Sequence, residues 1–168
     1  MKKEYGIKAG DRVLIYMPMV VEAAITMLAC ARIGAIHTVV FGGFASNELA
    51  NRIDDADPAL IVVSSMGLEP KKEIHYVPIV EEALKLSKHN PPRLLHQRRE
   101  LDGKLIETQI SQGNPMYKDF DELVDKETEI AECVPLPSTH PLYILYTSGT
   151  TGSPKGIVRD TGGTVVAM

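Results

Sequence analysis

The sequence has 168 residues, of which 44% are hydrophobic and 24% are charged, and its formal net charge is −4. This length and composition are ordinary for one soluble globular domain, and the negative charge argues against a general nucleic-acid binder, which would normally be basic. Two cysteines and five scattered histidines lack the spacing of a disulfide scaffold or a zinc site, so we expect no metal site and a reduced, intracellular setting.

The first half of the chain alternates short β-branched runs with helical patterns. The expected strands are residues 12–17, 35–41 and 58–64, and the expected helices are residues 20–33, 46–56 and 77–87. Gly34 is expected to end the first helix, and Ser46 is expected to cap the start of the second. Residues 65–76 are expected to form a loop.

The second half is less regular. Strands are expected at residues 93–99, 142–146 and 156–159, and residues 100–137 are polar and irregular apart from a helix expected at 117–126. Strands that alternate with helices indicate an α/β fold with a mostly parallel sheet and flanking helices. Such sheets bind ligands beyond the carboxyl ends of their strands, where the loops after Phe41 and Tyr146 would lie.

The apolar region at residues 13–44 does not have the pattern of a membrane span. In and around it, the longest stretch without Asp, Glu, Lys or Arg is residues 33–47, which is shorter than the ~18 residues that a span needs. The N-terminus, MKKEYGIKAG, has no apolar segment behind its lysines and is not a signal peptide. We therefore expect no membrane association.

The segment YTSGTTGSPKG, residues 146–156, has the chemistry of a phosphate-binding loop. Gly149 and Gly152 permit unusual backbone conformations and leave room for an approaching anion, and Lys155 supplies a mobile positive charge. It is not the common P-loop motif, because Lys155 follows Pro154 and no Ser or Thr comes after the lysine. On composition alone, a flexible connector remains the alternative. The hydroxyl side chains within the loop are Thr147, Ser148, Thr150, Thr151 and Ser153.

This segment closely resembles the phosphate-loop signature of the AMP-forming, adenylate-forming enzymes, a superfamily that contains acyl-CoA synthetases, luciferases and peptide-synthetase adenylation domains. Every Gly, Ser/Thr, Pro and Lys position of the signature is filled, and Ser153 occupies a position that the family leaves free. Residues 10–53 resemble the acetyl- and propionyl-CoA synthetase branch, of which ACARIGAIH and VFGGF are typical.

Two residues favour the propionyl-CoA synthetases within that branch. KGIVRDTGG carries Arg159 and Asp160 where acetyl-CoA synthetases usually carry histidine and threonine. The alternative interpretation is that these residues are a strand end and a helix cap.

The resemblance implies the reaction of the family. A short-chain carboxylate attacks the α-phosphorus of ATP, with Mg2+ present, to give acyl-AMP and pyrophosphate, and the thiol of CoA then displaces AMP. It assigns the ATP phosphates to Thr147, Ser148, Gly149, Thr150, Thr151, Gly152 and Lys155. The partners are therefore small molecules: the acid, ATP and CoA.

The resemblance assigns CoA to two segments. The first, near the CoA adenine, is Phe41, Gly42 and Gly43, and the second, near the CoA phosphates, is Glu69, Pro70, Lys71 and Lys72. The second segment is arginine-rich in acetyl-CoA synthetases, so Glu69 and Lys72 in two of those arginine positions predict weaker salt bridging. From the residues alone, the alternative is an exposed charged turn.

The resemblance also implies that residues 1–168 are an incomplete fragment of the AMP-binding N-terminal domain, matching roughly the second quarter of a family member. The C-terminal domain with its catalytic lysine is absent, and both ends lie within expected helices. We expect an acid–thiol ligase by family, with no catalytic residue or metal ligand in this chain and no activity of the chain alone. The alternative is an inactive remnant that binds at most a nucleotide or a partner. The expected location is the cytoplasm or the mitochondrial matrix.

Overall fold

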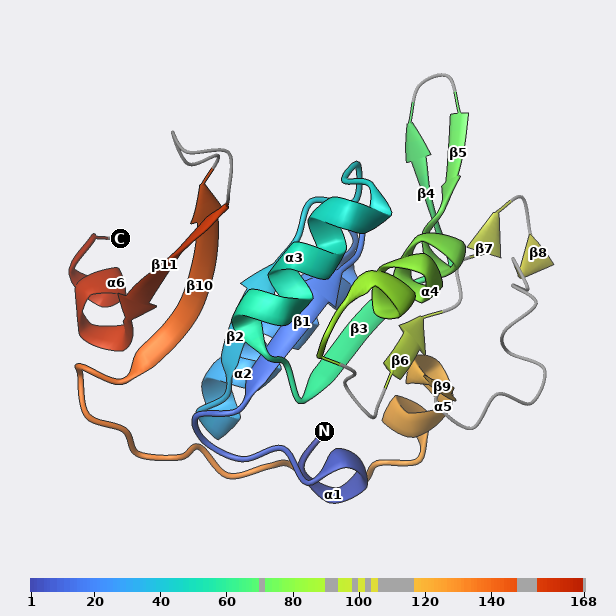
Figure 1. Ribbon diagram of the computed structural model, residues 1–168. Coiled ribbons are helices and arrows are strands. Elements are labelled where there is room, and N and C mark those ends of the chain that lie inside the picture. Colours follow the sequence, from blue (N-terminus) through green and yellow to red (C-terminus); the bar gives the residue numbers. More distant parts are fainter. Residues whose placement is uncertain are drawn as a thin grey trace.

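The computed structural model describes residues 1–69, 72–89, 94–97, 100–101, 104–105, 117–147 and 154–167. Within these residues, seven strands form one sheet in the order β11-β10-β2-β1-β3-β6-β9 (Figure 1). Every neighbouring pair is parallel except β10 and β11, which confirms the mostly parallel sheet. The strands are β1 (Arg12–Tyr16), β2 (Ile36–Val39), β3 (Leu60–Ser64), β6 (Leu94–Gln97), β9 (Tyr117–Asp119), β10 (Pro141–Thr147) and β11 (Lys155–Asp160).

Helices cover both faces of this sheet. In Figure 1, α3 and α4 lie in front of the central strands and α2 lies behind them. The helices are α1 (Lys2–Tyr5), α2 (Val21–Ile33), α3 (Ser46–Ala56), α4 (Tyr76–Leu86), α5 (Phe120–Asp125) and α6 (Thr161–Ala167). Two small hairpins complete the described elements: β4 (Met66–Glu69) with β5 (Lys72–His75), and β7 (Glu100–Leu101) with β8 (Lys104–Leu105).

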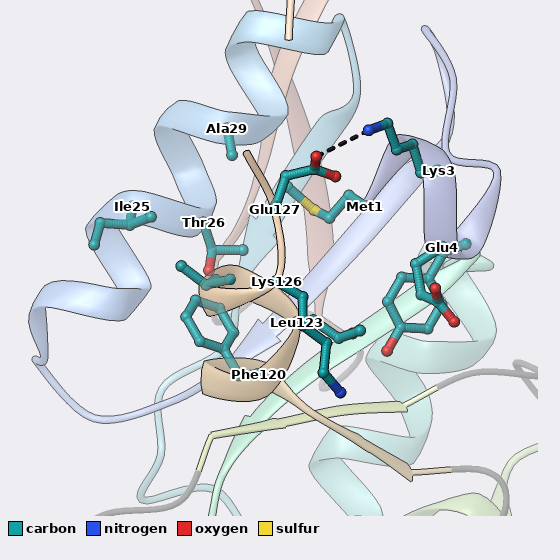
Figure 2. Close-up of a pocket in the computed structure, with 12 residues that line it drawn as sticks. Met1, Lys3, Glu4, Ile25, Thr26, Ala29, Phe120, Leu123, Lys126 and Glu127 are labelled. Carbon is teal, nitrogen blue, oxygen red and sulfur yellow. Dashed lines mark hydrogen bonds and ion pairs between the residues drawn. The ribbon is translucent and has the colours of Figure 1, made fainter. Parts of the chain in front are cut away.

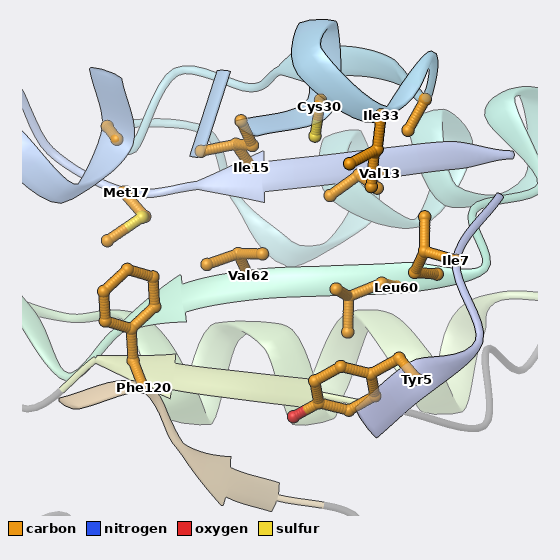
Figure 3. Packing of buried hydrophobic residues seen from close by; sticks show 12 residues of the cluster. Tyr5, Ile7, Val13, Ile15, Met17, Cys30, Ile33, Leu60, Val62 and Phe120 are labelled. Atoms are coloured by element: carbon orange, nitrogen blue, oxygen red, sulfur yellow. The ribbon is translucent and has the colours of Figure 1, made fainter. Parts of the chain in front are cut away.

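Strand β1 shows why the sheet is buried on both faces. Its side chains alternate, so Val13 and Ile15 pack with Cys30 of α2 on one face (Figure 3). Leu14 and Tyr16 belong to the second core cluster, with the side chains of α3 and α4. A central parallel strand that is covered by helices on both faces has a continuous apolar sequence. The sequence of β1 shows this pattern.

Most predicted elements are confirmed, including α2 with its end at Gly34, whose φ is 76°. The predicted cap at Ser46 is wrong, because Ser46 is the first helical residue, Ala45 precedes it, and no side chain caps this end. The predicted loop at 65–76 is also wrong, since it contains the β4–β5 hairpin. The helix predicted at 117–126 begins only at Phe120, because Tyr117–Asp119 pairs with β6 and the Asp119 carboxylate accepts a hydrogen bond from the Glu122 amide (2.9 Å).

No helix in the described part of the chain has both the length and the apolar character needed to cross a membrane.

Candidate functional site

The predicted phosphate loop connects two antiparallel strands. Strand β10 ends at Thr147 and β11 begins at Lys155, and these two residues are paired in register. Both residues are exposed, so the hydroxyl of Thr147 and the ammonium of Lys155 suit contact with phosphate oxygens. The predicted residues Ser148, Gly149, Thr150, Thr151 and Gly152 lie outside the described residues.

Tyr146, just before the loop, is held by helix α3. Its hydroxyl donates a hydrogen bond to Oδ2 of Asp55 (2.6 Å). Partial burial of the phenol raises the pKa of Tyr146, and the neighbouring Asp55 carboxylate raises it further. The phenol therefore stays protonated at neutral pH and acts as a hydrogen-bond donor at the start of the loop.

The first predicted CoA segment follows strand β2 at the carboxyl end of the sheet. Phe41 is 69% exposed, and its ring meets the ring of Phe44 edge to face, with centroids 5.9 Å apart. The hydroxyl of Tyr16, the last residue of β1, donates to the backbone oxygen of Phe44 (2.8 Å) and lies 3.3 Å from that of Gly42. The end of one strand thus fixes the loop that follows its neighbour.

The two glycines of this segment leave space that the chain itself occupies. A Cβ at Gly42 would collide with the phenol of Tyr76, and a Cβ at Gly43 would lie 2.5 Å from the ring of Phe41. Glycine is therefore needed at both positions so that the side chains of Tyr76 and Phe41 can pack there. The approach of a flat ligand ring to these glycines stays a prediction.

The second predicted CoA segment lies on the β4–β5 hairpin, which projects from the top of the sheet in Figure 1. Glu69 and Lys72 are paired in register, and Lys72 is exposed. Pro70 and Lys71 lie outside the described residues.

One pocket lies between the first predicted CoA segment and the hairpin that carries the second, although no described residue of the second segment lines it. It has a volume of about 360 Å³ and is lined by residues 17–20, 39–43, Leu68 and Tyr76. Leu68 comes from β4 and residues 41–43 follow β2, so the hairpin and the glycine loop share one cavity with a largely apolar wall. An apolar wall suits a flat heteroaromatic ring. The sequence did not indicate a role for Tyr16 or Tyr76 at this pocket. A tyrosine at a strand end or at a helix start has the pattern of an ordinary core residue.

A larger pocket, of about 500 Å³, lies elsewhere, among α1, α2 and α5 (Figure 2). Nζ of Lys3 lies 2.9 Å from a carboxylate oxygen of Glu127 at this pocket, and the Thr26 hydroxyl donates to the Glu22 backbone oxygen (2.7 Å). Its described lining contains none of the predicted site residues. Volume alone therefore does not identify the site, and the chemistry of the residues points to the carboxyl ends of the strands.

Cys30 does not have the surroundings of a catalytic thiol. Cys30 is a buried residue of α2, and this burial raises the pKa of its thiol to about 12. Cys133 is exposed. Within the described ranges, no three His, Cys, Asp or Glu side chains lie together as a set of metal ligands.

Known proteins match the whole of this chain. The sequence profile described as "AMP-binding enzyme" matches residues 1–168. The chain is 51% identical over 166 residues to "Acyl-CoA synthetase short-chain family member 3, mitochondrial" of Bos taurus, covering 98% of this chain and 23% of that protein. It is 46% identical over 166 residues to the propionate–CoA ligase of Salmonella typhimurium, covering 97% of this chain and 25% of the ligase.

A solved structure matches the fold. The acetoacetyl-CoA synthetase from Streptomyces lividans has a TM-score of 0.81 and 27% identity, covering 99% of this chain and 24% of the synthetase chain. This match confirms the expected fold class. The chain spans about a quarter of the length of these three proteins.

Proposed function

The chain belongs to the AMP-binding enzyme family, and from this premise we propose that it is a segment of the AMP-binding domain of a short-chain acyl-CoA synthetase. The observation that carries the proposal is the register pair of Thr147 and Lys155. This pairing holds the two ends of the phosphate-loop signature side by side. The names of the relatives from Bos taurus and Salmonella typhimurium support the same activity.

The proposed reaction of the whole protein has two steps. An oxygen of the acid carboxylate forms a bond to the α-phosphorus of ATP, the bond to the β-phosphate oxygen breaks, and pyrophosphate leaves. The sulfur of CoA then forms a bond to the acyl carbon, the acyl–phosphate bond breaks, AMP leaves, and the thiol proton is released. The magnesium that accompanies ATP would neutralise part of the phosphate charge.

The contribution of this chain to the first step is positioning and charge. Lys155 balances negative charge on the β- and γ-phosphates, and the hydroxyl of Thr147 donates a hydrogen bond to one of their oxygens. Because the two residues are exposed at the ends of a paired hairpin, they can reach an anion while their backbones stay fixed.

The contribution to the second step is the pocket beside Phe41, Gly42 and Gly43. We place the adenine ring of CoA against its apolar wall, with the CoA phosphates toward the tip of the β4–β5 hairpin. Lys72 is exposed there and supplies one positive charge. By sequence, position 69 is a glutamate and not an arginine. Salt bridging to the phosphates is therefore weaker than in an arginine-rich segment.

Propionate is the acid that we favour, supported by the similarity to the Salmonella propionate–CoA ligase and by Arg159 and Asp160. In the structure, Asp160 also accepts a hydrogen bond from the Gly163 amide (2.5 Å) at the start of α6. This contact gives Asp160 a capping role and leaves Arg159 as the residue to test. Replacing Arg159 by His in the longer protein is expected to shift the ratio of acetate to propionate use, whereas an unchanged ratio would remove Arg159 from the argument.

The experiment that tests the proposed function is acid-dependent exchange of labelled pyrophosphate into ATP. A longer protein that contains this segment is expected to catalyse exchange with propionate, and the Lys155→Ala variant is expected to lose about 10²-fold or more of it, as expected for a group that stabilises charge in the transition state. The 168-residue chain alone is expected to show none. Absence of exchange from the longer protein would refute the proposal. Exchange catalysed by the isolated chain would refute its assignment as an incomplete segment.

We place the whole protein inside the cell, in the cytoplasm or the mitochondrial matrix.

A further inference from the structure

Among the described strands, the end of β10 has no register partner on its β2 side. In the described strands, β10 pairs with β2 at Tyr143 and Ile144 alone. The remaining residues, up to Thr147, continue to pair with β11. Figure 1 shows the β10–β11 hairpin leaning away from the central strands. Since the predicted phosphate loop begins at Thr147, side chains have to fix its position on this side.

Helix α3 provides those side chains. Asp55 accepts the hydrogen bond of Tyr146 at 2.6 Å, and the guanidinium carbon of Arg52 lies 5.5 Å from the centroid of the Tyr146 ring. Gly156, opposite Tyr146 on β11, leaves room for this contact, since a Cβ there would be 3.2 Å from both Asp55 Oδ2 and the Tyr146 ring. The sheet residue before the loop is thus held by two side chains one helical turn apart.

Arg52 has a second aromatic partner. Its guanidinium carbon lies 4.3 Å from the centroid of Phe44, the residue directly after the glycine loop at 41–43. Distances of this size fall within the range of cation–π attraction, which is about 6 Å. One guanidinium therefore contacts both an aromatic ring beside the proposed CoA loop and an aromatic ring beside the proposed phosphate loop.

Burial of the Arg52 guanidinium makes its positive charge energetically costly. Arg52 is 4% exposed, and a buried charge is costly unless it is paired and hydrogen-bonded. Its Nη1 donates to the backbone oxygen of Glu48 (2.6 Å) and to Oε2 of Glu48 (2.8 Å). The Glu48 carboxylate compensates the charge, and the flat faces of the guanidinium remain for the two rings. A lysine could keep the ion pair but could not stack in this way.

We propose that Arg52 is a positioning residue that ties the start of the phosphate loop, through Tyr146, to the glycine loop, through Phe44. The inference rests on the proposed function, because the roles of the two loops come from it. Arg52 itself touches no substrate in this arrangement. It sets where Thr147, and with it the phosphate-binding end of β10, stands relative to the pocket at residues 41–43.

The first test needs no substrate. Amide hydrogen exchange of the longer protein that contains this segment is compared between the wild type, Arg52→Lys, Arg52→Met and Tyr146→Phe. Exchange at residues 143–147 and 155–159 is expected to rise at least about fivefold in each variant, with exchange in β1 and β3 unchanged, since loss of a cation–π contact or hydrogen bond opens a segment locally. Lys85→Met, a change of an exposed side chain on α4, is the control and is expected to alter neither region.

Unchanged exchange of the hairpin in Arg52→Lys overturns the inference. If Arg52→Met loses protection throughout the chain, Arg52→Lys still decides, because it keeps the charge that pairs with Glu48. Pyrophosphate–ATP exchange by the longer protein is the second test. There, Arg52→Lys is expected to raise the KM for ATP about fivefold or more while changing kcat much less. If the wild-type longer protein shows no exchange, the proposed function fails, and the amide exchange data still decide whether Arg52 positions the hairpin.

Discussion

The phenol of Tyr76 occupies the space that a side chain at Gly67 would need. Gly67 lies on β4 and Tyr76 is the first residue of α4, and the same phenol fills the space next to Gly42 in the loop after β2. The ring of Tyr76 also packs against that of Tyr16, with centroids 5.0 Å apart. A single buried side chain therefore sets the distance between the hairpin and the glycine loop that form the pocket.

Gly67→Ala is expected to displace the β4–β5 hairpin, because the new methyl group would overlap Tyr76. Overpacking of this kind costs about 1–3 kcal/mol. Amide exchange at residues 66–69 and 72–75 should become faster than in the wild type. The double variant Gly67→Ala/Tyr76→Leu should restore slower exchange than Gly67→Ala alone, since it removes the ring. Independent, additive effects of the two substitutions would show that the two positions do not interact.

The two cysteines should differ strongly in reactivity. Cys30 is fully buried and its thiol pKa is raised to about 12, so its thiolate fraction at pH 8 is about 10⁻⁴. Titration of the native chain with an aromatic disulfide reagent is expected to release one equivalent rapidly, and titration in urea to release two. The Cys133→Ser variant should release none rapidly. Fast reaction of two thiols in the native chain would contradict the burial of Cys30.

The main sheet could be predicted from the sequence because its signals are local. The apolar run that becomes β1, and the helix ended by Gly34, follow from burial and from the left-handed backbone that glycine favours. The β4–β5 hairpin was missed because Pro70 and the charged residues around it have the composition of a loop. The cap predicted at Ser46 is wrong for a similar reason: serine favours the cap position, but here the preceding Ala45 has the extended backbone and Ser46 is already helical.

The position of the candidate phosphate loop could be predicted, and its role stays a prediction. The glycine-rich signature predicted a loop after a strand, and in the structure Thr147 and Lys155 are register partners where β10 ends and β11 begins. The roles of Tyr76 and Arg52 had no local signal, since each depends on residues distant in the sequence. Tyr76 fills space beside Gly42, and Arg52 of α3 lies against the ring of Tyr146 of β10. Periodicity indicates which face of a helix is buried but not which ring a buried arginine meets.

Stability should fall between pH 7.5 and pH 5.5 because of His37. Partial burial lowers the pKa of this imidazole below its ordinary 6.5, and its Nδ1 has no hydrogen-bond partner among the described residues. Below about pH 6.5 the unfolded chain takes up a proton that the folded chain resists, so stability is lost as the pH falls. The urea midpoint, followed by circular dichroism, should therefore be lower at pH 5.5. His37→Phe, which keeps a ring beside Tyr143, should reduce this difference, and an equal difference in both proteins would exclude His37 as its cause.

The isolated chain should self-associate through the outer face of α2 and the segment before it. Large apolar side chains are exposed there: Met19 is 104% exposed, Val21 69%, Ile25 49% and Leu28 71%. Contiguous exposed apolar surface favours association in water, at roughly 25 cal/mol for each Å² that is buried. Sedimentation velocity at increasing concentration is expected to show species larger than the monomer. Leu28→Glu should shift the distribution toward monomer, because burying an unpaired carboxylate in the contact is costly.

Asn51→Glu adds the same charge at an exposed position of α3 and serves as the control. A wild-type chain that stays monomeric at all concentrations, or a Leu28→Glu chain that associates as the control does, would show that this face does not drive association.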